Sequence, residues 1–179
     1  MDLRHAPIVR TVTALACLIA ALTFTTAGLS PAHGAAAVRG PASVHGTGTW
    51  LNDGICAPST PPPGADLACI GRTIWHGPLL TGTTLYTASG TVTTAGDIIG
   101  RADETFTGSA ANNARGTIHF TESISLTATG TVFVSADAIG GTGDFCHVTG
   151  HLDFTGIADQ SGIGSGSYAG HIVTPKNCG

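Results

Sequence analysis

The chain has 179 residues, with 26 glycines, 10% charged residues, 42% hydrophobic residues and a formal net charge of −4. This length allows one domain with a sizeable core and excludes two ordinary domains. Lys and Arg are scattered rather than gathered in a stripe, which with the acidic balance argues against a nucleic-acid or acidic-membrane partner. Few charges together with many Gly, Thr and Ser residues indicate an all-β domain with many tight turns.

The start of the chain has the features of a secretory signal peptide. Arg4 and Arg10 form a basic start, residues 11–29 are an apolar stretch, and a run of small residues, "AHGAAA", follows at 32–37. Cleavage within this run would leave a secreted protein with no stable membrane insertion. We therefore predict a signal peptide over residues 1–34 and an extracellular location.

Two alternatives to cleavage exist. The apolar stretch nearly reaches membrane-spanning length, so an uncleaved anchor is the first alternative. "ALAC", residues 14–17, is similar to a lipoprotein signal, in which the cysteine becomes the lipidated first residue. A lipoprotein signal ends its apolar stretch at that cysteine, whereas this stretch continues past Cys17. Lipidation is therefore the weaker alternative.

The rest of the chain reads as a flexible mature N-terminus over residues 35–45, followed by one β domain over residues 46–179. From Gly46 onward, short alternating runs of apolar and polar residues are separated by Gly, Asn and Asp. Such runs are typical of antiparallel strands, and no helical period competes with them. The strands are expected within residues 47–51, 69–77, 79–93, 95–108, 115–128, 130–141, 144–156 and 164–174. Their spacing predicts an antiparallel sandwich or a closed barrel.

Four cysteines remain once the signal segment is removed: Cys56, Cys69, Cys146 and Cys178. An even number in a secreted chain predicts disulfide bonds, for which three connectivities are possible. Cys56 and Cys69 flank a Pro-rich loop, which favours a local bond and leaves Cys146 with Cys178. The cysteine spacing contains no CxxC pair and does not suit zinc. We therefore predict a disulfide-stapled domain without a metal site.

Several stretches together resemble a group of uncharacterised secreted bacterial proteins related to the allene oxide cyclase-like β-barrel family. They are "WHGPLLTGTTLYTASG", "ADETFTG", "RGTIHFTES", "GGTGDFCHVTGHLDFTG" and "GSGSYAGHI". The resemblance covers roughly residues 46–173, and it implies an eight-stranded antiparallel barrel that needs no cofactor. It does not transfer catalysis, because one fold hosts many functions.

Two glutamates are the strongest candidates for chemistry. In residues 117–126 the even positions hold Ile, Phe, Glu122, Ile and Leu, whereas the odd positions are polar. The even face is therefore the buried one, and Glu122 points inward. Glu104 shares the even positions of residues 98–107 with Phe106, so it points inward as well unless a bulge at Gly100 intervenes.

The predicted hairpin brings these glutamates together. A loop centred near residues 111–112 would pair Phe106 with Ile118, Glu104 with Phe120, and Ala102 with Glu122. The two carboxyls would then be diagonal neighbours within side-chain reach. Desolvation and like charge should raise the pKa of at least one of them. The alternatives are a structural network or side chains that reach solvent at the barrel mouth.

Further candidates line the same predicted interior. Tyr86 lies in a strand of small residues that could leave room for a ligand or only for Tyr86 itself. Trp75 and Trp50 could be cavity aromatics or core residues, and Phe120 shares the inward face of Glu122. We take Glu104, Glu122, Tyr86, Phe120 and Trp75 as candidate ligand-binding residues, with Glu104 and Glu122 as candidates for catalysis.

The histidines late in the chain are not expected to hold a metal. His147, His151 and Asp153 share one parity and are expected as an exposed ladder along a strand. Histidines four residues apart on a strand lie too far from each other to share a metal ion without a third element.

Three functions fit these features. The first is a secreted barrel that binds a small apolar or amphipathic molecule in its lumen. The second is a cofactor-free isomerase or cyclase of the allene oxide cyclase type that uses Glu104 or Glu122. The third is a structural or interaction module whose barrel is filled by its own side chains. The sequence does not decide among them or define the oligomeric state.

Overall fold

The computed structural model describes residues 42–52, 57–58, 60–159 and 162–175. These residues all belong to one compact unit, Ala37–Gly179. The predicted signal peptide and most of the predicted flexible segment lie outside the described residues, as do Cys56 and Cys178. No helix within the described ranges is long and apolar enough to span a bilayer.

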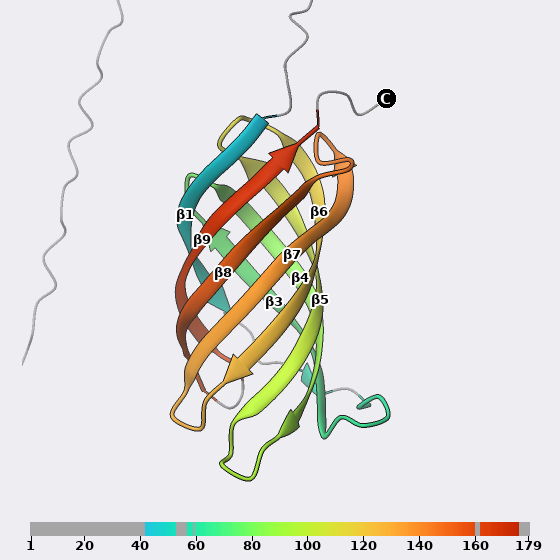
Figure 1. Ribbon diagram of the computed structural model, residues 1–179, viewed down its shortest axis with the longest axis vertical. Helices are drawn as coiled ribbons and strands as arrows, with labels where there is room; N and C mark the ends of the chain where they lie inside the picture. Colours follow the sequence, from blue (N-terminus) through green and yellow to red (C-terminus); the bar gives the residue numbers. More distant parts are fainter. Residues whose placement is uncertain (1–41, 53–56, 59, 160–161, 176–179) are drawn as a thin grey trace, which may run out of the picture. The chain divides into compact units, whose positions relative to one another are not determined.

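The described chain folds into antiparallel strands that close into a barrel (Figure 1). The strands are β1 (Ala42–Asn52), β2 (Ala57–Pro58), β3 (Leu67–His76), β4 (Leu80–Val92), β5 (Ile98–Ala110), β6 (Arg115–Leu126), β7 (Thr131–Gly143), β8 (Thr149–Ala158) and β9 (Gly164–Thr174). Each of β3 to β9 pairs with its neighbour in the chain, and β9 pairs with β1. A further pairing of β1 with β3 closes the ring. The expectation of an eight-stranded antiparallel barrel is confirmed, with the two-residue β2 attached outside the ring.

Two expectations about strand limits are wrong. Strand β1 begins at Ala42 rather than near Gly46, because Ser43–His45 already pair with β9. The segment Asp144–Val148, expected as strand, forms turns instead. Backbone hydrogen bonds stabilise these turns; for example, the Val148 N–H donates to the Phe145 carbonyl at 3.0 Å.

The solid part of the core fills one end and the middle of the barrel. Trp75 is 1% exposed and lies in the centre, with its ring 5.1–5.5 Å from the rings of Phe106, Phe120, Phe154 and Tyr168. Leu79, Leu80, Phe145 and Val148 are fully buried at the end where β4 begins. Alternation along each strand explains this arrangement, because every second side chain points into the ring.

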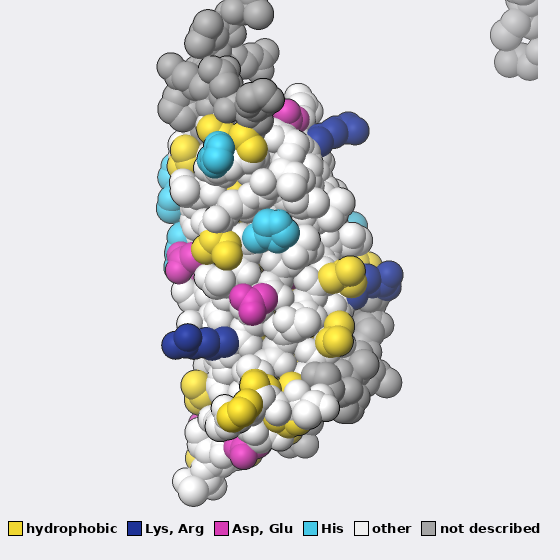
Figure 2. Space-filling model, turned by 90° about the vertical axis from the view of Figure 1, so that its right-hand side faces the viewer, with side chains coloured by type: hydrophobic (Ala, Val, Ile, Leu, Met, Phe, Trp, Pro, Cys, Tyr) yellow, Lys and Arg dark blue, Asp and Glu magenta, His cyan; other side chains and the backbone are white. Residues whose placement is uncertain are grey.

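The outer surface carries charges of both signs. Figure 2 shows basic, acidic and histidine side chains scattered over one face between uncharged residues, with no patch of a single sign. Some apolar side chains are also exposed on the outer face, including Leu85, Phe133 and Ile157. The aromatic core is therefore enclosed by a surface on which polar and apolar groups are mixed.

Candidate functional site

The other half of the barrel encloses a cavity of about 510 Å³. Its lining includes the last residues of β1, β6 and β8 and the first residues of β3 and β5, so it lies at the end of the barrel opposite Leu79 and Leu80. Aliphatic side chains form much of the wall: Leu67, Ile98, Ile124, Leu126, Val132 and Val134. Four aromatic rings also line it: Trp50, Trp75, Tyr86 and Phe154.

Polar groups gather on one side of this cavity. Asn52, Tyr86, Glu104 and Glu122 all line it. They come from β1, β4, β5 and β6, and the last three strands are consecutive neighbours in the sheet. The cavity therefore combines an apolar wall with a single polar corner, and we refer to these four residues as the polar corner. Lys, Arg and His are absent from the described residues that line the cavity.

Backbone register places the two glutamates together as the sequence predicts. Glu104 pairs with Phe120, Ala102 pairs with Glu122, and Phe106 pairs with Ile118. The pairing continues without a shift through Gly100, so no bulge turns Glu104 outward. The two carboxyls are consequently diagonal neighbours on the inner face, and their side chains are hydrogen-bonded to each other.

Burial changes the acidity of both carboxyls. Glu104 is 5% exposed, and desolvation raises its pKa, while hydrogen bonds with Glu122 and Thr84 oppose this rise. Desolvation raises the pKa of Glu122 well above its usual range, and the charge of Glu104 and the hydrogen bond to it add to the rise. A hydrogen bond between two carboxyls requires a proton on one of them. The two carboxyls therefore share a proton, and the pair as a whole resists full ionisation.

Tyr86 completes the polar corner beside Glu104, its partner across β4 and β5. Its hydroxyl accepts a 2.7 Å hydrogen bond from Nδ2 of the buried Asn52. Burial raises the pKa of Tyr86, the Asn52 bond opposes the rise, and the two glutamates add to it. The hydroxyl is therefore a neutral group that can donate its own proton.

A glycine on the neighbouring strand makes room for this tyrosine. Gly71 pairs with Tyr86 across β3 and β4. A Cβ atom at Gly71 would lie 2.2 Å from Cζ and from the hydroxyl oxygen of Tyr86. Any side chain there would displace the ring, so Gly71 fixes where the Tyr86 hydroxyl lies.

The remaining sequence-predicted residues divide between the cavity and the core. Trp75 lines the cavity, and its indole Nε1 is buried without a hydrogen-bond partner among the described residues. Trp50 also lines the cavity and donates from Nε1 to the Thr155 carbonyl at 3.3 Å. Phe120 is 1% exposed, packs against Trp75 and does not line the cavity. Phe120 therefore belongs to the core beneath the site.

Sequence reasoning missed Asn52 and Thr84. Asn52 is the last residue of β1 and follows Trp50 by two positions, so both face inward. The same period of two that placed Glu104 would have placed Asn52, had the strand been extended by one residue. Thr84 shares the inward parity of Tyr86, but a threonine in a run of threonines gives no signal of its own.

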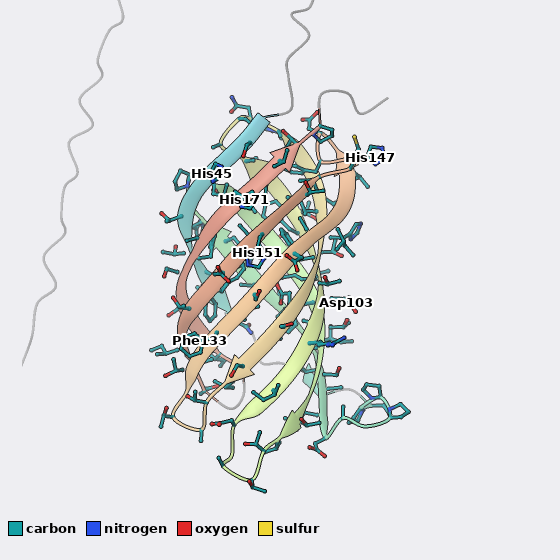
Figure 3. All side chains as sticks on the ribbon, viewed as in Figure 1. His45, Asp103, Phe133, His147, His151 and His171 are labelled. Carbon is teal, nitrogen blue, oxygen red and sulfur yellow. The ribbon has the colours of Figure 1, made fainter. Side chains whose placement is uncertain are left out.

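The late histidines lie outside the site. His45, His171 and His151 are neighbours across β1, β9 and β8 on the outer face (Figure 3). His151 hydrogen-bonds Asp137 at 2.7 Å and Asp153 at 3.3 Å. The expectation that His147 belongs to this ladder is wrong, because His147 lies in the turn before β8 with φ 53°. These groups do not contact the cavity.

A second hollow of about 420 Å³ borders the first. It is lined by exposed residues such as Arg101, Asp103 and Thr121 together with the Pro-rich loop, and it reaches Glu122. Asp103 is labelled on the ribbon of β5 in Figure 3. Glu122 therefore lies between the cavity in the barrel interior and this outer hollow.

The fold and the site define a class: an antiparallel eight-stranded barrel with an internal cavity that has one acidic corner. No model of a known protein family matches the chain, and no curated protein matches it. Among solved structures, the pterocarpan synthase dirigent protein GePTS1 has the same fold with a TM-score of 0.52. The match covers 78% of this chain and 88% of the dirigent protein at 11% sequence identity. This likeness establishes the fold relationship alone.

Proposed function

We propose that this protein is a secreted barrel that binds a small apolar or amphipathic molecule in its lumen. The observation that carries the proposal is the cavity of about 510 Å³, which has apolar walls and one polar corner. Ligand sites of this size are typically apolar with a few polar groups that fix the orientation of the ligand. Eight-stranded barrels are wide enough to hold one such molecule.

The experiment is equilibrium binding of Nile red, an uncharged dye whose fluorescence rises in apolar surroundings. We expect saturable binding at one site per chain. Ala88 lines the cavity on β4, so Ala88→Phe should narrow the cavity and weaken binding. Thr83→Phe adds the same ring to the exposed face of β4 and should leave binding unchanged. Absence of saturable binding, or equal binding by both variants, would contradict the proposal.

A second function, cofactor-free isomerisation or cyclisation, is favoured by the carboxyl pair. A protonated carboxyl inside an apolar-walled cavity can donate a proton to a substrate oxygen, and the walls can hold a reactive conformer. The resemblance to allene oxide cyclase-like barrels points in the same direction. Glu122 would be the general acid and Tyr86 a hydrogen-bond donor. A filled interaction module is the least supported function, because the barrel is not filled.

Secretion and the two disulfide bonds are part of the same proposal. Ala57 and Pro58 pair with Ile70 and Cys69, so the chain beside Cys56 runs next to Cys69. Thr174, four residues before Cys178, ends β9 beside β8, which begins shortly after Cys146. Peptide mapping of the protein from culture medium, without reduction, should give Cys56–Cys69 and Cys146–Cys178. Free thiols or crossed pairs would contradict this part of the proposal.

A further inference from the structure

The cavity has acidic groups and no basic residue among its described lining residues, and this restricts the charge of the ligand that it can bind. The two carboxyls of Glu104 and Glu122 are its acidic groups, and no Lys, Arg or His stands among its described lining residues. Buried charges in proteins are normally paired with a group of opposite charge. Among the described residues, the two glutamates are relieved by the proton that they share and by bonds from neutral groups. The polar corner therefore has acidic groups that can bind a cation, and no basic residue among the described lining residues supplies one.

The aromatic residues of the cavity wall point to the same ligand chemistry. The rings of Trp50, Trp75, Tyr86 and Phe154 line the cavity together with the carboxyl pair. Trp75 and Phe154 are in direct contact, with ring centroids 5.1 Å apart. Aromatic faces attract ammonium groups, and the attraction is stronger where water is excluded. A cavity that holds both a carboxyl pair and aromatic rings can therefore hold an amine more tightly than a neutral polar group.

We propose that the cavity selects an apolar molecule that carries a protonated amine, whose ammonium group replaces the shared proton of the Glu104–Glu122 pair. This inference rests on the proposed function, because it names the ligand class of the same cavity. The ammonium would donate to the carboxylate oxygens, and its apolar part would lie against the aliphatic wall. Binding of the ammonium releases the shared proton to solvent, so one positive charge replaces another and the net charge of the site is unchanged. Anionic ligands such as fatty-acid carboxylates are rejected by the same corner.

Three probes that share one ring system test this inference: naphthylmethylamine, naphthylmethanol and naphthoate. Calorimetric titration near neutral pH should show the amine binding at least about tenfold more tightly than the alcohol, with no binding of naphthoate. Glu122→Gln and Glu104→Gln should each remove the preference for the amine while keeping the alcohol bound. Asp153→Asn removes a charge from the outer face of β8 and should keep the preference.

The pH dependence gives a second readout. On β4, the titratable group beside the carboxyl pair is Tyr86. On β5, the charge of Asp103 also acts on Glu122. On β7, the residue opposite Glu122 is Ala136, which has no charge. Arg101 and Asp103 share the outer hollow that reaches Glu122. The affinity for the amine should rise with pH as the carboxyl pair loses its proton, and that for the alcohol should not.

The outcomes separate the two proposals. Equal affinity of the alcohol and the amine, or tight binding of naphthoate, overturns the amine inference and leaves the cavity proposal standing. Failure of all three probes and of Nile red to bind overturns both. A preference for the amine that persists in the double variant Glu104→Gln, Glu122→Gln overturns the assignment to the carboxyl pair.

Discussion

At the scale of single residues, the unusual feature is a pair of carboxyls that face each other inside the barrel. Both have a raised pKa, chiefly through burial. Thr84 and the pair itself satisfy part of their hydrogen-bonding capacity, and Tyr86 with Asn52 borders them. An acidic pair in this setting costs stability, so its position is explained better by a ligand than by the fold.

The sign of the pH effect follows from the raised pKa values. Below the unfolded pKa of about 4.3, folded and unfolded chains are both protonated. As pH rises above this value, the unfolded chain loses the proton while the folded chain keeps it, so stability falls until the folded pKa is passed. The fall is about 1.4 kcal/mol for each unit by which the folded pKa is raised.

Glu122→Gln should therefore reduce the fall in the free energy of unfolding that occurs as pH rises above about 4.3. The variant should gain stability relative to the wild type as pH rises, because it has no carboxyl to ionise there. Denaturant unfolding followed across pH gives the difference, with Asp153→Asn as the control for an exposed carboxyl on β8. Parallel curves for wild type and Glu122→Gln would show that the pair is solvated.

The outer ion pairs should matter much less. The hydrogen bond with Asp137 is the main cause that raises the pKa of His151, burial opposes the rise, and Asp153 adds to it. Their stabilisation is present below the unfolded pKa of His, about 6.5, and is lost as pH rises through the folded value. Because these side chains are exposed, His151→Gln should cost within about 1 kcal/mol in mildly acid solution and nothing measurable in alkaline solution. A larger loss, measured by thermal unfolding, would contradict this view.

At the scale of elements, glycines opposite tyrosines shape the barrel wall. Tyr86 lies over Gly71 of β3, and Tyr168 lies over Gly48 of β1. Tyr168 also fixes the start of β4, because its hydroxyl donates to the Leu80 carbonyl at 2.6 Å. The two tyrosines of the chain thus have different tasks: Tyr168 ties core strands together, and Tyr86 faces the cavity.

Gly71→Ala should disturb the cavity without unfolding the barrel. The added methyl group forces Tyr86 to move, at a cost of about 1–3 kcal/mol in stability, and should weaken Nile red binding. Gly46→Ala is the control, because its Cβ would meet the Leu79 side chain at 3.3 Å, away from the cavity. Equal effects of the two substitutions on dye binding would show that the position of Tyr86 is unimportant.

Elements with a clean period of two were predictable from the sequence. The alternation in β6 fixed its inward face, and the hairpin loop then fixed the pairing of Glu104 with Phe120. The turn at Asp144–Val148 was not predictable in the same way, because its apolar residues fill the barrel end while its backbone bends. The start of β1 was missed because pairing with β9, rather than local composition, makes Ser43–His45 a strand.

At the scale of the whole molecule, side-chain size divides the barrel into a solid half and a hollow half. Large aromatic rings meet around Trp75 and close the interior on one side. Beyond them, small residues such as Ala88, Gly90 and Gly100 line the wall, and the interior stays open as a cavity. This division could not be read from the sequence, because periodicity gives the direction of a side chain and not how well its neighbours fill the space. The polar corner lies within the hollow half, where a ligand can reach it.

The most direct test of the account is whether a ligand occupies this hollow half. Binding of Nile red should be saturable for the wild type and for Thr83→Phe, and it should be weaker in Ala88→Phe while the circular dichroism of the protein is unchanged. Such a result would place the ligand inside the barrel. Undiminished binding by a correctly folded Ala88→Phe would contradict the account, because the dye would then lie elsewhere on the molecule.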